Sequence, residues 1–141
     1  MHLFGFALRD FVNIERYCGR RSICLVHDCF PLDERTAGLD RATRFWSGDV
    51  WKLILCLKKY RPDLEVHTIA AAPTGLAVIR GLDPGSTILR DRMDRICEEF
   101  ADLPYSVLRD DKNRKLNLVR NDWPTVRALL GSPLVETIAF S

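Results

Sequence analysis

Apolar positions along the chain recur with two different periods, one typical of helices and one typical of strands. Spacings of three and four residues predict an amphipathic helix over residues 3–18, with Gly19 as a left-handed cap just beyond it. The short apolar run at residues 22–27 predicts a strand covered on both faces, as in a parallel sheet. Residues 28–46 carry many charges and predict a long loop, and ordered loops of this length are often functional.

The middle of the chain carries the signals of a helix followed by a hairpin. Ser47 is a favourable N-cap for a helix that ends in two lysines before Pro62. Residues 64–70 alternate and residues 76–80 are mostly apolar, which predicts two strands joined by the turn at residues 73–75. Such a hairpin places one antiparallel strand in an otherwise parallel sheet.

The last third of the chain is predicted to be mostly helical. Ser86 predicts the cap of a helix that ends before Pro104, and Asp122 predicts the cap of a short final helix. Residues 109–120 hold five basic and two acidic residues, and without interleaved aromatic side chains we interpret them as a solvated loop. We therefore expect a helical extension, residues 83–141, that packs on an α/β unit formed by residues 1–82.

Composition narrows the functional classes. A chain of 141 residues, 47% hydrophobic and 28% charged, is typical of one globular domain. Its 21 Lys and Arg nearly balance its 19 Asp and Glu, so neither nucleic acid nor an anionic membrane is an expected partner. No apolar run approaches the roughly 18 residues of a membrane span. The opening residues do not resemble a secretory signal.

The five cysteines indicate whether the protein belongs to a reducing or an oxidising compartment. Their number is odd and no Cys-x-x-Cys pair occurs, so neither a disulfide framework nor a closed zinc site is expected. Cys24, Cys56 and Cys97 lie in apolar stretches, where we expect small buried side chains. The sequence favours a reduced, cytoplasmic protein.

Four segments together resemble a known family. They are Val-His-Asp-Cys-Phe-Pro at residues 26–31, Phe-Trp-Ser-Gly-Asp-Val-Trp-Lys at 45–52, Arg-Pro-Asp-Leu at 61–64 and Gly-Leu-Ala-Val-Ile-Arg at 75–80. The chain resembles the C-terminal half of class I S-adenosylmethionine-dependent methyltransferases, in particular the small-molecule O-methyltransferase-like group. The resemblance implies an α/β fold: a partial Rossmann-like sheet with one parallel strand, an antiparallel hairpin and a helical C-terminal extension.

The same resemblance names candidate site residues. Members of the group carry an Asp-Gly-x-His segment that opens a helix, and His2 matches its histidine, which can serve as a general base. They also carry an acidic pair, or His-Asp, at the end of the next strand, which His27 and Asp28 match. The resemblance thus implies His2, His27 and Asp28 as catalytic residues, with Asp28 as a ligand of a divalent cation such as Mg²⁺.

The cofactor half of the family pattern is not found in the sequence. Members hold S-adenosylmethionine by a glycine-rich turn after the first strand and by an acidic residue after the second. No Gly-x-Gly occurs in this chain, and no strand is predicted before residue 3. The resemblance therefore implies S-adenosylmethionine as the cofactor but assigns no cofactor-binding residue here.

Each candidate residue also has a purely structural interpretation. Asp28 could organise the following loop through backbone amides, and His2 could be a frayed terminal residue. Trp46 and Trp51 could line an acceptor pocket or could anchor the loop to the helix. Cys29 is interpreted as structural, because only His27 nearby could lower the pKa of its thiol.

Three functional hypotheses follow. The first is the acceptor-side half of an O-methyltransferase, inactive alone, with a small-molecule acceptor and with self-association or a partner chain that completes the sheet. The second is a small α/β binding or interaction module in which residues 86–141 cover the sheet. The third is an active methyltransferase, so whether the chain is an enzyme stays open.

Overall fold

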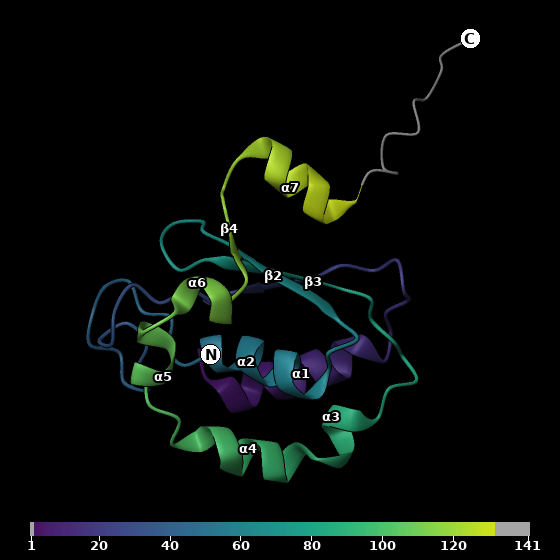
Figure 1. Cartoon of the computed structure of the whole chain (residues 1–141). Helices are drawn as coiled ribbons and strands as arrows, with labels where there is room; N and C mark the ends of the chain where they lie inside the picture. The colour runs from purple at the N-terminus through teal and green to yellow at the C-terminus, as the bar shows by residue number, and fades with distance from the viewer. Residues whose placement is uncertain (1, 132–141) are drawn as a thin grey trace.

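A four-stranded sheet lies between two layers of helices, with α7 on one face and α1 and α2 on the other (Figure 1). This computed structural model describes residues 2–131, so residues 132–141 of the expected extension lie outside the described residues. The elements are α1 (Phe4–Glu15), β1 (Cys24–His27), α2 (Trp51–Tyr60), β2 (Glu65–Ile69), β3 (Leu76–Arg80), α3 (Ile88–Asp91), α4 (Met93–Ala101), α5 (Ser106–Arg109), α6 (Lys112–Lys115), β4 (Leu118–Val119) and α7 (Trp123–Leu130).

The sheet is mixed, with strand order β1-β3-β2-β4. β3 runs antiparallel to both β1 and β2, and β2 runs parallel to β4. The predicted α/β class and the antiparallel hairpin strand within an otherwise parallel sheet are therefore confirmed. In the register, Leu76 of β3 faces His27 on one side and Ile69 on the other, so the carboxyl ends of β1 and β2 lie at the same edge.

The prediction that β1 is covered on both faces is wrong. β1 is the border strand of the sheet in the described chain and pairs only with β3. Leu25 is 54% exposed, and Ile14 of α1 is also exposed. Both side chains line a groove beside β1. An apolar run alone does not distinguish a central strand from a border strand.

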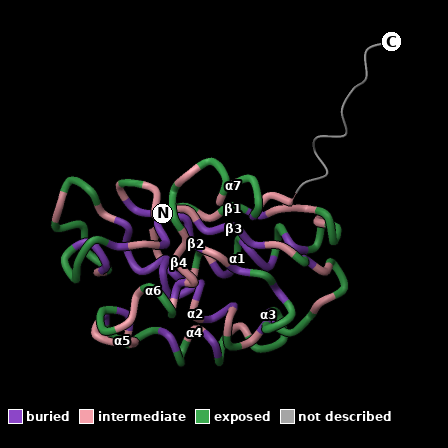
Figure 2. Tube along the Cα trace, turned by 45° about the horizontal axis from the view of Figure 1, so that its top comes forward, coloured by how far each residue is buried: buried purple, intermediate pink, exposed green. Residues whose placement is uncertain are grey.

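The main core lies between the sheet and the α1–α2 layer (Figure 2). Leu8 of α1, Leu53 and Leu57 of α2 and Ile79 of β3 have no exposed surface. On the far side of this layer, α4 adds Ile96 and Phe100, and the Phe100 ring lies 5.3 Å from that of Phe4. A smaller cluster on the opposite sheet face joins α7 to β2 and β3 and consists of Ile69, Val78 and Leu129.

A buried ion pair joins the two central helices. Arg61, which is 1% exposed, donates from Nη1 to both carboxylate oxygens of Glu15 at 2.8 Å. It also donates from Nη2 to Asp63 at 2.7 Å.

α1 ends at Glu15, four residues before the predicted Gly19 cap, and the Gly19 amide instead donates to Ser22 Oγ. The cap prediction is therefore wrong.

The Ser47 cap is also corrected. α2 begins only at Trp51; Gly48 has φ = +59°, outside the right-handed helical region, and the hydroxyl of Ser47 donates to the carbonyl of Thr36 at 2.9 Å. That contact, together with the indole of Trp46 donating to Gly38 at 2.8 Å, ties the two ends of the long loop together. The loop itself is as predicted: no helix or strand occurs between β1 and α2.

The region after residue 83 differs from its prediction in two places. The predicted helix from Ser86 is broken into α3 and α4, and α3 follows Thr87 instead. The basic segment 109–120 is folded as α6 and β4, and Lys112 donates to the carbonyls of Pro31 and Leu32, which anchors the long loop. The solvated-loop interpretation is therefore wrong.

The final helix follows its prediction. Asp122 accepts from the amide of Thr125 at 2.9 Å, Pro124 lies in the first turn and Gly131 follows the helix. None of the helices in residues 2–131 has both the length and the apolar character needed to cross a bilayer.

Candidate functional site

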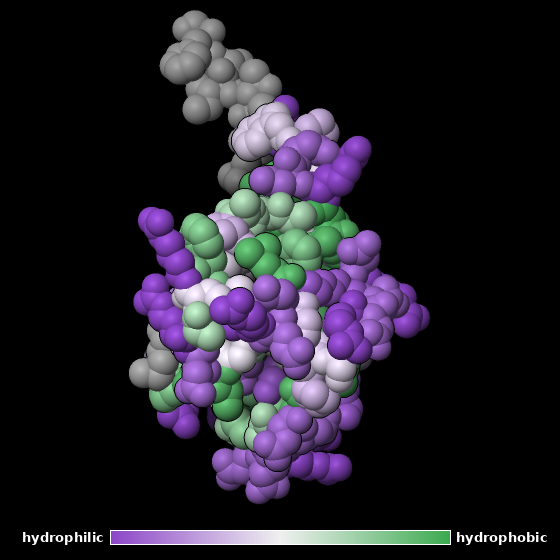
Figure 3. Space-filling model, turned by 90° about the vertical axis from the view of Figure 1, so that its left-hand side faces the viewer, coloured by the Kyte–Doolittle hydropathy of each residue, from purple (hydrophilic) through white to green (hydrophobic). Residues whose placement is uncertain are grey.

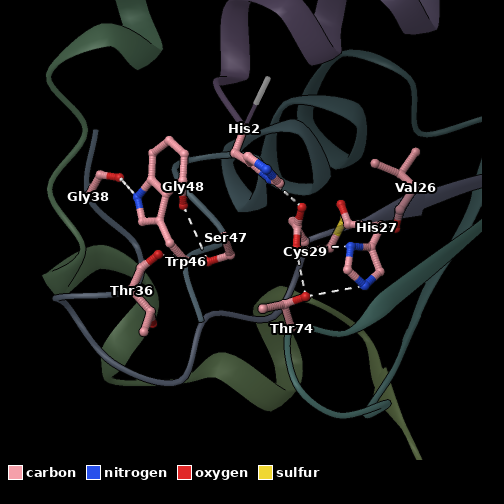
Figure 4. Close-up of polar contacts among 11 residues, drawn as sticks. His2, Val26, His27, Cys29, Thr36, Gly38, Trp46, Ser47, Gly48 and Thr74 are labelled. Carbon is pink, nitrogen blue, oxygen red and sulfur yellow. Dashed lines mark hydrogen bonds and ion pairs between the residues drawn. The ribbon is translucent and has the colours of Figure 1, made fainter. Parts of the chain in front are cut away.

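Asp28 is the first residue after β1, and three side chains gather around its carboxylate, those of His2, His27 and Thr74, which Figure 4 labels. The backbone of Asp28 has φ = +66°, a conformation that aspartate tolerates better than most residues, and the residue is 7% exposed. The carboxylate is thus held by side chains in the described structure, and not by the backbone amides of the following loop.

His2 lies against Asp28 and has defined contacts in the structure. Its Nδ1 lies 2.5 Å from Asp28 Oδ2, and its ring meets the edge of Trp46 at 5.0 Å between centroids. Its backbone carbonyl accepts from the amide of Asp49 at 3.2 Å. When the Asp28 carboxylate is ionised and the His2 ring is neutral, the ring hydrogen lies on Nδ1 and Nε2 is left as an acceptor, because an ionised carboxylate only accepts hydrogen bonds.

Asp49 connects the His2 segment to the rest of the fold. Its Oδ1 accepts from the amide of Phe4 at 2.6 Å, at the start of α1, where a negative charge is favourable. Its Oδ2 lies 3.1 Å from Nζ of Lys52, and both side chains are buried. Lys52 in turn donates to the carbonyl of Ala101 in α4. The start of α1, α2 and α4 are therefore joined directly behind His2.

His27 and Thr74 complete the cluster from the sheet side. His27 Nδ1 lies 2.9 Å from Asp28 Oδ1, and the Thr74 hydroxyl donates to the same oxygen at 2.6 Å. Thr74 precedes β3, and its carbonyl accepts from the amide of Phe30 at 2.7 Å. The turn before β3 is thereby bound to the start of the long loop, which holds Thr74 beside the carboxylate.

A cavity of about 270 Å³ opens in front of the cluster. The cluster residues line it together with a set of loop and turn residues: Arg41, Arg44, Phe45, Trp46 and Pro73. The two tryptophans that were candidates for lining an acceptor pocket therefore lie in different places. Trp46 lines the cavity, whereas Trp51 is 1% exposed and packs in the core against Tyr105.

The structure thus brings His2, His27 and Asp28 together, although residue 2 and residues 27–28 are far apart in the chain. The arrangement can orient an imidazole, keep one tautomer and accept a proton at the free ring nitrogen, as a carboxylate–histidine pair does in general base catalysis. His27, with 63% of its side chain exposed, lies on the solvent side of the same carboxylate.

The donor set does not fit the divalent cation that the resemblance implies. Both carboxylate oxygens of Asp28 already contact hydrogen-bond donors. Within residues 2–131, no three His, Cys, Asp or Glu side chains are grouped so that they could hold one metal ion.

The cysteines take no part in the cluster. Cys29, although next to Asp28 in sequence, is fully buried and its thiol contacts the carbonyl of Val26 at 3.3 Å. Burial raises the pKa of the Cys29 thiol far above its ordinary value. The five cysteines are all free, and the structural interpretation of Cys29 agrees with its burial.

Sequence reasoning missed Thr74, Arg41 and Arg44. Thr74 was seen only as part of a turn, and its role depends on how the turn lies beside β1. The two arginines come from the loop that was identified as long and charged, but its path over the sheet edge is not encoded in a local pattern.

Comparison of the chain with protein families, with curated proteins and with solved structures finds no match.

Proposed function

We propose that this chain supplies the acceptor-side half of an S-adenosylmethionine-dependent O-methyltransferase. The contact of 2.5 Å between His2 Nδ1 and Asp28 Oδ2 carries the proposal, because it holds a base beside a cavity. The position of Asp28 agrees with it, since ligands of open α/β sheets bind beyond the carboxyl ends of the strands. The antiparallel β3 also agrees with the sheet expected from the family resemblance.

His2 is the proton acceptor in this proposal. An acceptor hydroxyl in the cavity would donate its hydrogen bond to Nε2 of His2, and that nitrogen would receive the hydroxyl proton. S-adenosylmethionine, when bound, would supply its methyl group as an electrophile and leave as the thioether S-adenosylhomocysteine. Asp28 holds the ring through Nδ1 and stabilises the imidazolium that forms. Thr74 and His27 hold Asp28.

The cofactor-binding strands of the proposed enzyme would pair with the outer edge of β1. Within the described chain β1 pairs on one side only, and its exposed Leu25 lies next to Ile14 in the groove beside that edge. We expect the chain alone to give no heat with millimolar S-adenosylmethionine in calorimetry. Clear binding heat would contradict this half of the proposal and would favour a complete cofactor site within the chain.

The same edge predicts self-association. In light scattering we expect particles heavier than the 16.2 kDa monomer, and Leu25→Lys should shift them toward the monomer. Leu39→Lys places the same charge at a similarly exposed leucine of the long loop and serves as the control. A monodisperse monomer of the unaltered chain would contradict the pairing of β1.

Binding of matched small molecules tests the base directly. We compare 4-hydroxybenzamide with 4-methoxybenzamide, which cannot donate to His2, and follow the indole N–H signal of Trp46 by NMR. We expect about fivefold tighter binding of the hydroxyl compound and loss of this preference in His2→Phe, with His67→Phe as the control. Equal binding of the two compounds, or a preference that survives in His2→Phe, would contradict the proposal.

A second candidate function is a small α/β binding module, and one observation favours it. Residues after 83 do cover the sheet: Leu129 of α7 packs on Ile69 and Val78, and β4 adds a fourth strand. In that case ligands would bind without regard to a hydroxyl group. The comparison of hydroxyl and methoxy compounds therefore also separates the two functions.

A further inference from the structure

Positive charge gathers at the cavity in front of His2. Arg41 and Arg44 both line it, whereas the acidic residue that lines it, Asp28, already contacts three donors. The arginines are exposed, so their guanidinium groups are accessible to a ligand. The face that carries the long loop is mostly hydrophilic, with its largest hydrophobic region below α7 and smaller ones on its lower part (Figure 3).

The loop segment that carries these arginines is held by its own hydrogen bonds. Arg41 Nη2 donates to the carbonyl of Arg44 at 3.3 Å, and the hydroxyl of Thr43 donates to the carbonyl of Phe45 at 2.8 Å. The guanidinium of Arg44 lies over the ring of Phe45, 5.9 Å from its centroid. Trp46, which follows, is tied to Gly38 and contacts His2. The two arginines are thus linked by a short segment to the wall of the cavity.

We propose that the acceptor is an anionic hydroxyl compound, a flat ring that bears a carboxylate or phosphate group. Arg41 and Arg44 would bind the anionic group, since guanidinium groups form charge-assisted hydrogen bonds to both kinds of oxyanion. Trp46 would contact the ring, and His2 would receive the hydroxyl proton. This inference rests on the proposed function and adds the charge of the substrate to it.

The test compares ligands that differ only in charge. We titrate the 15N-labelled full chain with 4-hydroxybenzoate and with neutral 4-hydroxybenzamide, and follow the Trp46 indole signal. We expect the benzoate to bind about tenfold tighter. The difference should disappear in Arg41→Gln/Arg44→Gln and persist in Arg16→Gln/Arg20→Gln, which removes two exposed arginines that do not line the cavity. Inorganic phosphate should displace the benzoate and leave the amide bound.

Two results would overturn the inference. Equal affinity of the charged and neutral compounds would do so, and so would a preference for the benzoate that is unchanged in Arg41→Gln/Arg44→Gln. Neither result bears on His2, because its role is measured with two neutral compounds, the hydroxyl and methoxy benzamides. A failure of the charge preference and a failure of the base are therefore separate outcomes.

Discussion

The carbonyl oxygen of His2 lies where a side chain of residue 48 would begin: a Cβ on Gly48 would be 1.7 Å from it. Gly48 also has φ = +59°, which favours glycine. Its lack of a side chain therefore allows the first residues of the described chain to pack against the loop, with the His2 ring next to Asp28.

Gly48→Ala should displace His2. We expect the Cβ to push the His2 backbone away, separate the imidazole from Asp28 and change the ring contact with Trp46. The signals of the His2 ring and the Trp46 indole report this in two-dimensional NMR. Gly5→Ala is the control, because a Cβ there meets nothing within 4 Å. Because alanine is favoured over glycine within a helix, Gly5→Ala should raise the free energy of unfolding by about 0.5–1 kcal/mol. Unchanged ring signals in Gly48→Ala would contradict the packing described.

The substitution of threonine by valine should have opposite effects on stability at two positions, 74 and 68. Thr74→Val removes a donor from the buried Asp28 carboxylate and should lower the free energy of unfolding by about 1–3 kcal/mol. Thr68→Val removes a buried hydroxyl that has no hydrogen-bond partner in the described residues and should raise it by about 1 kcal/mol. Urea unfolding measures both. Equal effects of the two substitutions would show that the contact between Thr74 and Asp28 does not stabilise the fold.

The ion pair of Asp63 predicts a loss of stability in acid. The hydrogen bond from Arg61 lowers the pKa of Asp63 below its ordinary value, so the ionised carboxylate favours the folded state. Its contribution is present above the unfolded pKa of about 4 and is lost as the pH falls through the folded pKa. Asp63→Asn should therefore flatten the decline of the unfolding free energy below about pH 4.

The control for that measurement is Asp102→Asn, which removes the same charge from an exposed position at the end of α4. It should leave the acid slope closer to that of the unaltered chain. If the two variants lose stability in acid equally, the Asp63–Arg61 contact has no part in the pH dependence.

Cysteine reactivity tests where the core lies. Burial raises the pKa of Cys24 to about 11 and that of Cys56 to about 12, and it raises the pKa of Cys29 as well. At about pH 8 few of these thiols are ionised. Iodoacetamide should therefore modify Cys18 in the folded protein and reach Cys24, Cys29 and Cys56 only after unfolding, as measured by mass spectrometry. Rapid modification of Cys29 in the folded protein would contradict its position behind Asp28.

Local patterns predicted the hairpin and the capped final helix, because their signals lie within a few residues. Asp122 and Pro124 determine the start of α7 without help from distant contacts. Ser47 and Gly19 carry equally good local signals, but the first binds Thr36 across the loop and the second lies beyond the helix end at Glu15. For Ser47 a contact across the loop decides the structure, whereas the amide of Gly19 donates to Ser22, three residues away.

Three side chains of the candidate site were named from the sequence, but its geometry and its other members were not. His2, His27 and Asp28 follow from the family resemblance, and the structure places them around one carboxylate. The contribution of Thr74 depends on the pairing of β1 with β3, which no local signal encodes. The metal expected at Asp28 stays a prediction, and the oxygens of Asp28 contact side chains that come from other parts of the fold.

The central claim is that Asp28 holds His2 with a free Nε2 beside the cavity, and imidazole NMR tests it most directly. The chain has three histidines, so long-range 1H–15N spectra at a pH where the rings are neutral can be assigned by single substitutions. The account predicts a hydrogen on Nδ1 of His2 and none on Nε2, with His67 as the internal reference. A hydrogen on Nε2 of His2 would contradict the account.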